Sequence, residues 1–220
     1  MTHSIELLHS LQLTPDTKHY VFTRPEDYSF VPGQATDMAI DRDGWRDEDR
    51  PFTFTGHPNS KILSFVIKSY FDHDGVTKEL WSLKPGDHVK IGDPWGAIEP
   101  KGKGIFLAGG AGITPFIPII DRLANDGQLA GSKLIFANGT HHDIILREHF
   151  AAQDGLSCVF VTDDGKNADH AGQLSGDVLD QEIADFDSRF YLCGPPKMQD
   201  AILDYLHAKG VKDDQIVMDD

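Results

Sequence analysis

A glycine-rich turn contains the residues of this 220-residue chain that are best suited to chemistry. The run Gly109-Gly110-Ala111-Gly112-Ile113-Thr114-Pro115 directly follows an apolar, strand-like segment, Ile105–Ala108. Glycines let a backbone approach a ligand closely, and a helix that starts after a strand presents free N–H groups to a phosphate. We expect Thr114 to cap the following helix, Thr114–Ala124, and Pro115 to take its first position. This setting predicts a nucleotide site more strongly than an isolated glycine turn does.

A second turn follows another apolar segment in the same half of the chain. It is the run Cys193-Gly194-Pro195-Pro196-Lys197-Met198, and it comes after Phe190–Leu192. Taken alone, a cysteine in this place is more often a buried residue ahead of a helix than a functional one. Its position directly after a strand makes it a candidate for a ligand site as well.

The N-terminal half contains Arg50-Pro51-Phe52-Thr53 at the start of a predicted strand. An arginine there can bind a phosphate through its fork of N–H donors. Alternation along the strand places Arg50 and Phe52 on one face and Thr53 on the other. Taken alone, the segment is better explained as an ordinary strand with one arginine at its edge.

A helix start in the N-terminal half is a further candidate. Gly75-Val76-Thr77 precedes a predicted helix, Thr77–Leu83, with Thr77 as its expected N-cap. Free N–H groups at such a helix start suit a diphosphate. An ordinary capped turn is the simpler explanation when this segment is considered by itself.

The elements that must position these turns differ between the two halves. The first half consists of strand-length segments separated by Pro, Gly, Asp and Asn, which predicts a small antiparallel barrel. After the glycine-rich stretch 100–104, strands and helices alternate, which predicts a parallel sheet covered by helices on both faces. We therefore expect an antiparallel six-stranded β-barrel over residues 1–101 and a parallel α/β nucleotide-binding domain over residues 102–220.

Composition disfavours several other classes of protein. The formal net charge of -15 disfavours nucleic acid or an anionic membrane as a partner. Cys158 and Cys193 are too few for a disulfide scaffold or an iron–sulfur cluster held by this chain. Met1–Glu6 lacks the basic and apolar regions of a signal peptide, and no apolar run is long enough to span a bilayer, so we expect a cytoplasmic location. No metal site is predicted, because His141-His142-Asp143 has no spaced partner pair.

In their order along the chain, these segments resemble the ferredoxin–NADP reductase superfamily. The resemblance covers nearly the whole chain and rests on Phe30–Gln34, Arg50–Thr53, Gly75–Thr77, Gly92–Gly96, Gly109–Pro115 and Cys193–Pro195. It implies a flavin site of FAD type, made by Arg50, Pro51, Phe52, Thr53, Gly75, Val76 and Thr77. It also implies an NAD(P)H site made by Gly109, Gly110, Gly112, Ile113, Thr114, Cys193, Gly194 and Pro195.

The same resemblance implies roles for individual side chains. Arg50 is expected to hold the flavin diphosphate, Phe52 to stack on the isoalloxazine and Thr53 to approach its N5 atom. Cys193 is expected to lie near the nicotinamide as a positioning group, since hydride transfer needs no thiolate. Thr53 and Cys193 are thus the residues expected at the reacting atoms.

The sequence departs from the family pattern at three places. Phe52 replaces the commoner tyrosine, which keeps the stacking but loses the hydrogen bond of the phenol. Asp74 stands where a glycine is common, and an acid beside a diphosphate is unfavourable unless it points away. The segment Ile216–Asp220 has no aromatic residue, whereas family members often end with one that covers the flavin. Asp219 and Asp220 would then lie near the flavin, with no catalytic role assigned to them.

The choice of nicotinamide nucleotide leans towards NADH. In members that prefer NADPH, an arginine often follows the strand that corresponds to Leu134–Ala137, and Gly139 takes that place here. Thr162-Asp163-Asp164 follows the next strand and is acidic. Arg147 and Lys166 are the nearest cations in the sequence for a 2′-phosphate.

The resemblance implies an FAD-dependent NAD(P)H oxidoreductase that passes electrons to a separate carrier, such as flavodoxin or ferredoxin. No cysteine set for a fused iron–sulfur domain follows the second half. Two alternatives stay open: a reductase of small acceptors such as free flavin or ferric complexes, and a non-catalytic nucleotide-binding subunit. The acidity of the chain argues against acidic carriers, because like charges slow encounter.

Overall fold

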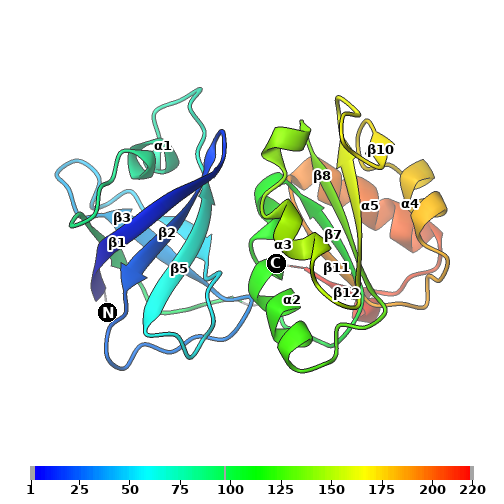
Figure 1. The fold of residues 1–220 in the computed structure, drawn as a ribbon, viewed down its shortest axis with the longest axis horizontal. Coiled ribbons are helices and arrows are strands. Elements are labelled where there is room, and N and C mark those ends of the chain that lie inside the picture. Colours follow the sequence, from blue (N-terminus) through cyan, green and yellow to red (C-terminus); the bar gives the residue numbers. More distant parts are fainter. Residues whose placement is uncertain (1–2, 97, 219–220) are drawn as a thin grey trace. The chain divides into compact units, whose positions relative to one another are not determined.

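The computed structural model describes residues 3–96 and 98–218 of the chain (Figure 1). It divides into two compact units, Met1–Ala97 and Ile98–Asp220, which we call the first unit and the second unit. The sequence predicts this division between residues 101 and 102. Asp219 and Asp220, expected near the flavin, lie outside the described residues.

The first unit is built on one antiparallel sheet of six strands, in the order β4-β3-β6-β1-β2-β5. Side chains from one face of this sheet form an apolar core, because successive residues of a strand point to opposite faces. The antiparallel pairing confirms the architecture expected of the first half. The strands, blue to green in Figure 1, are β1 (His3–Thr14), β2 (Thr17–Thr23), β3 (Ala35–Ile40), β4 (Arg50–Thr53), β5 (Ile62–Lys68) and β6 (His88–Ile91).

The two outer strands of this sheet come next to each other just beyond the end of β4. The N–H of Thr55 donates to the carbonyl of Ser64 in β5 at 2.9 Å. The enclosed core is rich in aromatic rings: Phe54 stacks on Phe30 with 4.3 Å between ring centroids, and its centroid lies 5.1 Å from that of Phe65. Since side chains fill the interior of such a small barrel, a ligand of this unit must bind at its outside or rim.

The helix of the first unit starts earlier than the sequence predicts. Helix α1 spans Val76–Trp81, and Gly75 takes the N-cap position in an extended conformation. Thr77 is therefore the second helical residue, and the prediction that it caps the helix was wrong. Its hydroxyl instead accepts the N–H of Tyr70 at 3.4 Å, and its carbonyl accepts the hydroxyl of Ser69 at 2.8 Å. These bonds tie the helix start to the chain that leaves β5.

The second unit contains a parallel sheet of six strands, in the order β10-β9-β8-β7-β11-β12. This confirms the α/β architecture expected of the second half. Its strands are β7 (Ile105–Gly109), β8 (Ser132–Asn138), β9 (Leu156–Thr162), β10 (His170–Ala171), β11 (Phe190–Cys193) and β12 (Ile216–Val217). Its helices are η1 (Gly110–Ile113), α2 (Phe116–Asn125), η2 (His141–Asp143), α3 (Arg147–Ala151), α4 (Gly176–Glu182), α5 (Pro196–Ala208) and η3 (Asp213–Gln215), where η marks a 3-10 helix.

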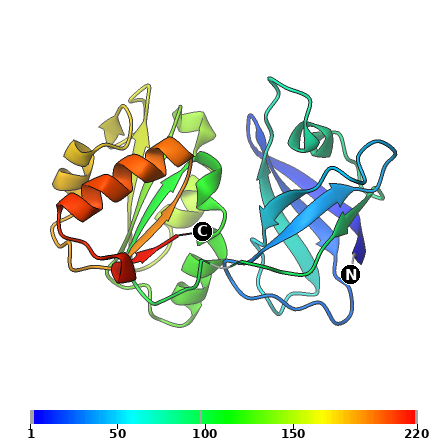
Figure 2. The same cartoon turned by 180° about the vertical axis from the view of Figure 1, so that it is seen from behind.

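Helices cover both faces of this parallel sheet. Figure 1 is seen from the side of α2 and α3, and Figure 2 from the side of α5. On the first face, Phe106 stacks on Tyr191 with 4.3 Å between ring centroids, and Phe116 of α2 packs edge-on against Phe106. The Tyr191 hydroxyl donates to the carbonyl of Gly102 at 2.7 Å and accepts the N–H of Lys101 at 2.8 Å. Lys101 and Gly102, the residues on either side of the predicted domain boundary, are thus bonded to the second unit.

Within residues 3–96 and 98–218, none of the helices combines the length and the apolar character that crossing a bilayer requires. The same residues include no group of three or more His, Cys, Asp and Glu side chains arranged to hold a metal ion.

Candidate functional site

The two predicted nucleotide turns meet at the point where the strand order of the second unit reverses. After β7 the chain adds β8 and β9 on one side, whereas β11 pairs with β7 on the other side. Gly109 ends β7 and Cys193 ends β11, so both turns leave the same edge of the sheet. Open parallel sheets bind their ligands outside this edge, at this reversal of strand order.

Glycines make the close packing of the two turns possible. A β-carbon on Gly109 would lie 2.5 Å from the sulfur of Met198 and 2.9 Å from Cδ of Pro195. A β-carbon on Gly194 would lie 3.1 Å from the backbone nitrogen of Gly109. The contact with the Pro195 ring is shorter than real β-carbons show, so a side chain at Gly109 would force the two turns apart. A side chain at Gly194 would require the backbone or the Met198 side chain to shift. The structure therefore brings the two segments together as one site.

One side of the glycine turn is open. Gly110 has a positive φ of +52°, which favours glycine, and a β-carbon there would meet nothing within 4 Å. A ligand can therefore approach the backbone from this side, where no side chain of the described residues stands in the way.

The start of the helix after this turn differs from the prediction. The residues Gly110–Ile113 already form the 3-10 helix η1, and α2 begins only at Phe116. Pro115 is the N-cap of α2, and Thr114 makes no capping bond through its side chain. The expectation that Thr114 caps the helix and Pro115 opens it was wrong, because helical turns begin at Gly110. The free N–H groups that suit a phosphate are thus those of the glycines themselves.

The cysteine turn is held by the helix that follows it. Helix α5 begins at Pro196, and Gln199 donates through Nε2 to the carbonyl of Gly194 at 2.8 Å. Cys193 is half-buried at the end of β11. Burial raises the pKa of the other thiol, Cys158, to about 11, so Cys158 is no nucleophile near neutral pH.

Two polar side chains that the sequence interpretation did not assign to the nucleotide site lie at the end of β8 and in η2 just after it. The amide oxygen and nitrogen of the Asn138 side chain and Nδ1 of His141 are buried. None of the three atoms has a hydrogen-bond partner in the part of the chain that the structure describes. The His141 nitrogen lies 3.9 Å from the Asp164 carboxylate. Buried polar atoms are nearly always satisfied, so unpaired ones mark a place for a ligand or water. The sequence signal that could have pointed to this place is Asn138, a polar residue at the end of the apolar strand β8.

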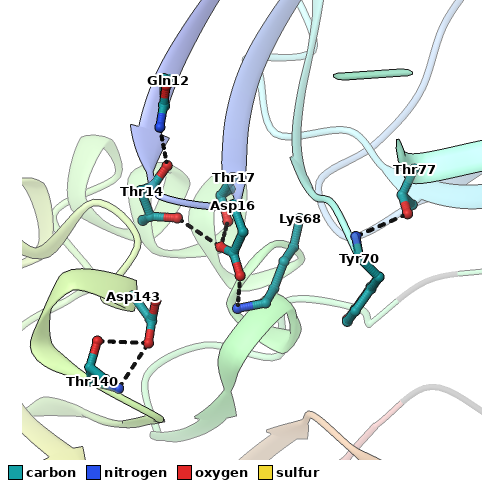
Figure 3. A network of polar contacts seen from close by, with 9 residues as sticks. All are labelled: Gln12, Thr14, Asp16, Thr17, Lys68, Tyr70, Thr77, Thr140 and Asp143. Carbon is teal, nitrogen blue, oxygen red and sulfur yellow. Dashed lines mark hydrogen bonds and ion pairs between the residues drawn. The ribbon is translucent and has the colours of Figure 1, made fainter. Parts of the chain in front are cut away.

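The cations expected near this edge have other partners or lie in the open. The guanidinium of Arg147 sits 4.2 Å above the ring of Phe160 and donates to the carbonyl of Asn167 at 2.7 Å. The Lys166 side chain is exposed, and only its backbone N–H donates to Asp164, at 3.1 Å, which lowers the pKa of that carboxyl. The turn after Gly139 is closed by Asp143, whose carboxylate accepts the hydroxyl of Thr140 at 2.8 Å (Figure 3).

In the first unit, strand β4 presents the predicted flavin residues on both of its faces. Thr53 lies opposite Ala35 of β3, and Phe52 lies opposite the buried Thr36. Phe52 accordingly packs in part against the core. The Arg50 guanidinium is about half exposed and lies 3.5 Å from the Glu48 carboxylate, where an incoming phosphate can compete for it.

The acid that departs from the family pattern is paired within its own turn. Asp74 is 91% exposed and accepts a bond of 2.8 Å from Lys78, which lowers the pKa of its carboxyl. Its charge is therefore balanced beside the start of α1. The sequence interpretation also missed Tyr70 and Phe71, two exposed aromatic residues in the segment that leads from β5 to this turn.

An ion pair fixes the end of β5 ahead of this segment (Figure 3). Lys68 lies 2.8 Å from Asp16 in the β1–β2 turn, and Asp16 also accepts the hydroxyls of Thr14 and Thr17 at 3.0 and 3.1 Å. Burial raises the pKa of Asp16, but the bonds from Lys68 and the two hydroxyls outweigh burial and lower the pKa below its usual value. The ends of three strands are thus held together.

Comparison with known proteins adds to this geometry. Residues 106–204 match the family model of the oxidoreductase NAD-binding domain. The chain is 28% identical to the toluate 1,2-dioxygenase electron transfer component of Pseudomonas putida, covering 84% of this chain and 56% of that protein. It is 27% identical to the propane 2-monooxygenase reductase component of Rhodococcus jostii, covering 94% of this chain and 61% of that protein. The chain thus spans less than two thirds of the length of these relatives.

A solved structure matches both units. A ferredoxin NADP+ reductase from Neisseria gonorrhoeae, with bound FAD and NADP, superposes with a TM-score of 0.86 at 20% sequence identity. The match covers 99% of this chain and 97% of that one. This likeness establishes the two-domain fold.

Proposed function

We propose that the chain is a member of the ferredoxin–NADP reductase superfamily and an NAD(P)H oxidoreductase that binds FAD on its first unit and the nicotinamide nucleotide on its second. When bound, FAD takes up the hydride of NAD(P)H and releases electrons singly or in pairs. The residues of this chain bind and orient the two molecules. Electrons leave to a separate acceptor.

The observation that carries this proposal is the junction of the two glycine turns. Gly112 packs against the backbone of Cys193 where only glycine fits, Gly109 and Gly194 pack closely beside it, and Gly110 leaves the outer side open. This packing presents backbone N–H groups at the carboxyl edge of the sheet, which suits the diphosphate of a dinucleotide. Cys193 closes the same site next to β7 and would orient the nicotinamide ring.

The first unit has the donors that FAD needs. The half-exposed Arg50 suits the diphosphate, together with the N–H groups of Val76 and Thr77 that have no acceptor within α1. The Thr53 hydroxyl is within the half-buried outer face of β4, where it can donate to a flavin nitrogen. The exposed rings of Tyr70 and Phe71 suit stacking on adenine. Asp74 does not oppose this assignment, because Lys78 balances its charge.

We propose NADH as the preferred nucleotide. The edge of β8 and β9 has Gly139 where a cation would read a 2′-phosphate, and Arg147 is engaged by Phe160 and Asn167. The Asp164 carboxylate repels a phosphate but accepts hydrogen bonds from ribose hydroxyls. The unsatisfied amide of Asn138 is a further partner for such a hydroxyl.

The acceptor is a separate protein of the flavodoxin or ferredoxin type, or a small molecule. The relatives named above are electron transfer and reductase components of oxygenases, which favours a protein acceptor. The net charge of -15 favours an acceptor whose docking face is basic, or a small acceptor such as free flavin or a ferric complex.

Anaerobic stopped-flow spectroscopy tests the proposal. The purified protein should carry one FAD, identified after denaturation by absorbance and mass spectrometry. NADH should bleach the flavin band faster than NADPH at equal concentrations. A protein that binds no flavin from free FAD, and oxidises neither nucleotide, contradicts the proposed function. Bleaching by NADPH alone contradicts only the nucleotide preference.

A further inference from the structure

Trp95 is the most exposed of the three tryptophans of the chain. Trp45 packs in part against the core of the first unit, and Trp81 meets Phe71 edge-on under the ammonium of Lys18. Trp95, in contrast, is 41% exposed, and within residues 3–96 and 98–218 its indole has neither a ring contact nor a hydrogen bond. Exposing a large aromatic ring is unfavourable, so a lone one on a rigid backbone is a candidate ligand contact.

The backbone of Trp95 is held in place. Its N–H donates to the carbonyl of Ala35 at 2.9 Å, and the N–H of Ala35 donates back to the carbonyl of Trp95 at 3.0 Å. This reciprocal pair makes an antiparallel bridge that continues the sheet past the end of β6. The indole therefore projects from a fixed point and not from a free loop.

The register of the sheet places Trp95 on the same face as the predicted flavin residue Thr53. Ala35 lies directly opposite Thr53 on one side and directly opposite Trp95 on the other. Residues opposite each other in an antiparallel pair project from the same face. The three side chains thus form a row in which Thr53 and Trp95 are roughly 10 Å apart at the backbone, the sum of two strand spacings.

The residue in the middle of the row is small. This residue, Ala35, contributes only a methyl group and is itself only half-buried. The neighbouring pair of Thr36 and Phe52 projects to the opposite face, towards the core. A planar ligand that meets the hydroxyl of Thr53 thus lies over Ala35 and faces the indole across a low floor.

We propose that Trp95 is a flavin-contact residue, which forms the wall of the isoalloxazine site on the side away from β4. This inference rests on the proposed function, because it assumes that FAD binds at Thr53. An indole in contact with an isoalloxazine quenches the flavin's fluorescence by reversible electron transfer in the excited state. Losing one aromatic contact of this kind weakens binding roughly 2- to 10-fold.

The test compares Trp95→Leu and Trp95→Phe with the matched control Trp45→Phe in the FAD-loaded full chain. The bridge between Ala35 and Trp95 uses backbone atoms alone, so these variants keep it, and circular dichroism verifies the fold. We expect the emission and the lifetime of bound flavin to rise several-fold in Trp95→Leu and less in Trp95→Phe. FAD affinity, measured by titration of the apoprotein, should fall roughly 2- to 10-fold in Trp95→Leu. Trp45→Phe should match the wild type in both measurements.

Two results separate this inference from the proposed function. If the wild-type protein binds no FAD, the proposed function fails first. If it binds FAD, and Trp95→Leu matches Trp45→Phe in flavin emission and affinity, the role of Trp95 is overturned while the proposed function stands. A variant that changes only the delivery of electrons to an acceptor also overturns the inference, since it makes Trp95 an acceptor contact.

Discussion

Gly112 and Cys193 approach so closely that no side chain fits between them: a β-carbon on Gly112 would lie 2.3 Å from the carbonyl oxygen of Cys193. This contact joins two segments that are far apart in the sequence. The nucleotide site thus depends on a packing condition as much as on the presence of donors.

Gly112→Ala should damage the fold and the site together. Separating the two turns to admit a methyl group costs about 1–3 kcal/mol of unfolding free energy, and we expect NADH affinity to fall about 10-fold or more. Urea unfolding and calorimetric titration measure the two effects. Gly139→Ala is the matched control, because its β-carbon meets only the Asp143 carboxylate at 3.4 Å. Wild-type binding by Gly112→Ala would show that the site does not depend on this contact.

Met198→Ala should loosen the nucleotide site without touching a reacting group. The Met198 side chain reaches both glycine turns, since its methyl carbon would lie 3.1 Å from a β-carbon on Gly109 and 2.6 Å from one on Gly194. Truncation should cost about 2 kcal/mol, the low end for Met→Ala because Met198 is only half-buried. Nucleotide KM should rise more than kcat falls. Met198→Leu keeps the volume and should restore most of the affinity; equal KM values in both variants would contradict this role.

Asp16→Asn should destabilise the protein in a pH-dependent way. The folded pKa of Asp16 lies below its unfolded value, so its contribution is present above about pH 4 and is lost as pH falls through the folded pKa. At pH 7 we expect a loss of about 1 kcal/mol, discounted for partial exposure. Urea unfolding at pH 7 and near pH 3 should show the difference from wild type shrinking at the lower pH. Asp43→Asn removes a 96% exposed partner of Arg46 and should have little effect at either pH.

Gly139→Arg should shift the nucleotide preference towards NADPH. The new guanidinium stands at the end of β8, where it can bind a 2′-phosphate through paired N–H donors. We expect the ratio of kcat/KM for NADPH to that for NADH to rise about 10-fold. Gly139→Gln is a neutral control of similar reach and should leave the ratio unchanged. A rise with glutamine would mean that side-chain length, and not charge, sets the preference.

The repetitive features of the fold could be predicted from the sequence, because they depend on local patterns. Apolar segments such as Ile105–Ala108 and the alternation of strands with helices are sufficient to predict a parallel sheet. The junction of the turns at Gly109 and Cys193 was also predictable once both were placed at strand ends. These inferences need no knowledge of register.

The exact helix starts could not be predicted in this way. A threonine ahead of an apolar run is a common cap, but the hydroxyl of Thr77 bonds to the N–H of Tyr70 instead. Likewise, Thr114 follows a helical turn that begins at Gly110. The partner of a hydroxyl is decided by the segments that fold back onto it, and no local pattern reports them.

The exposed aromatic residues were missed for a related reason. Whether Trp95 is buried or exposed depends on its pairing with Ala35, which is 60 positions earlier in the chain. A shift of this pairing by one residue would send the indole to the opposite face. Register of this kind is a property of the folded sheet.

Tryptophans and helices are distributed unequally over the chain, so two spectroscopic signals report on different halves of it. Trp45, Trp81 and Trp95 all precede residue 97, whereas α1 is the only described helix of the first unit. Tryptophan emission therefore follows the melting of residues 3–96, and the helical band of circular dichroism follows mainly residues 98–218. Whether the two units melt in one step or in sequence can thus be observed on the unmodified chain, without dyes or truncation.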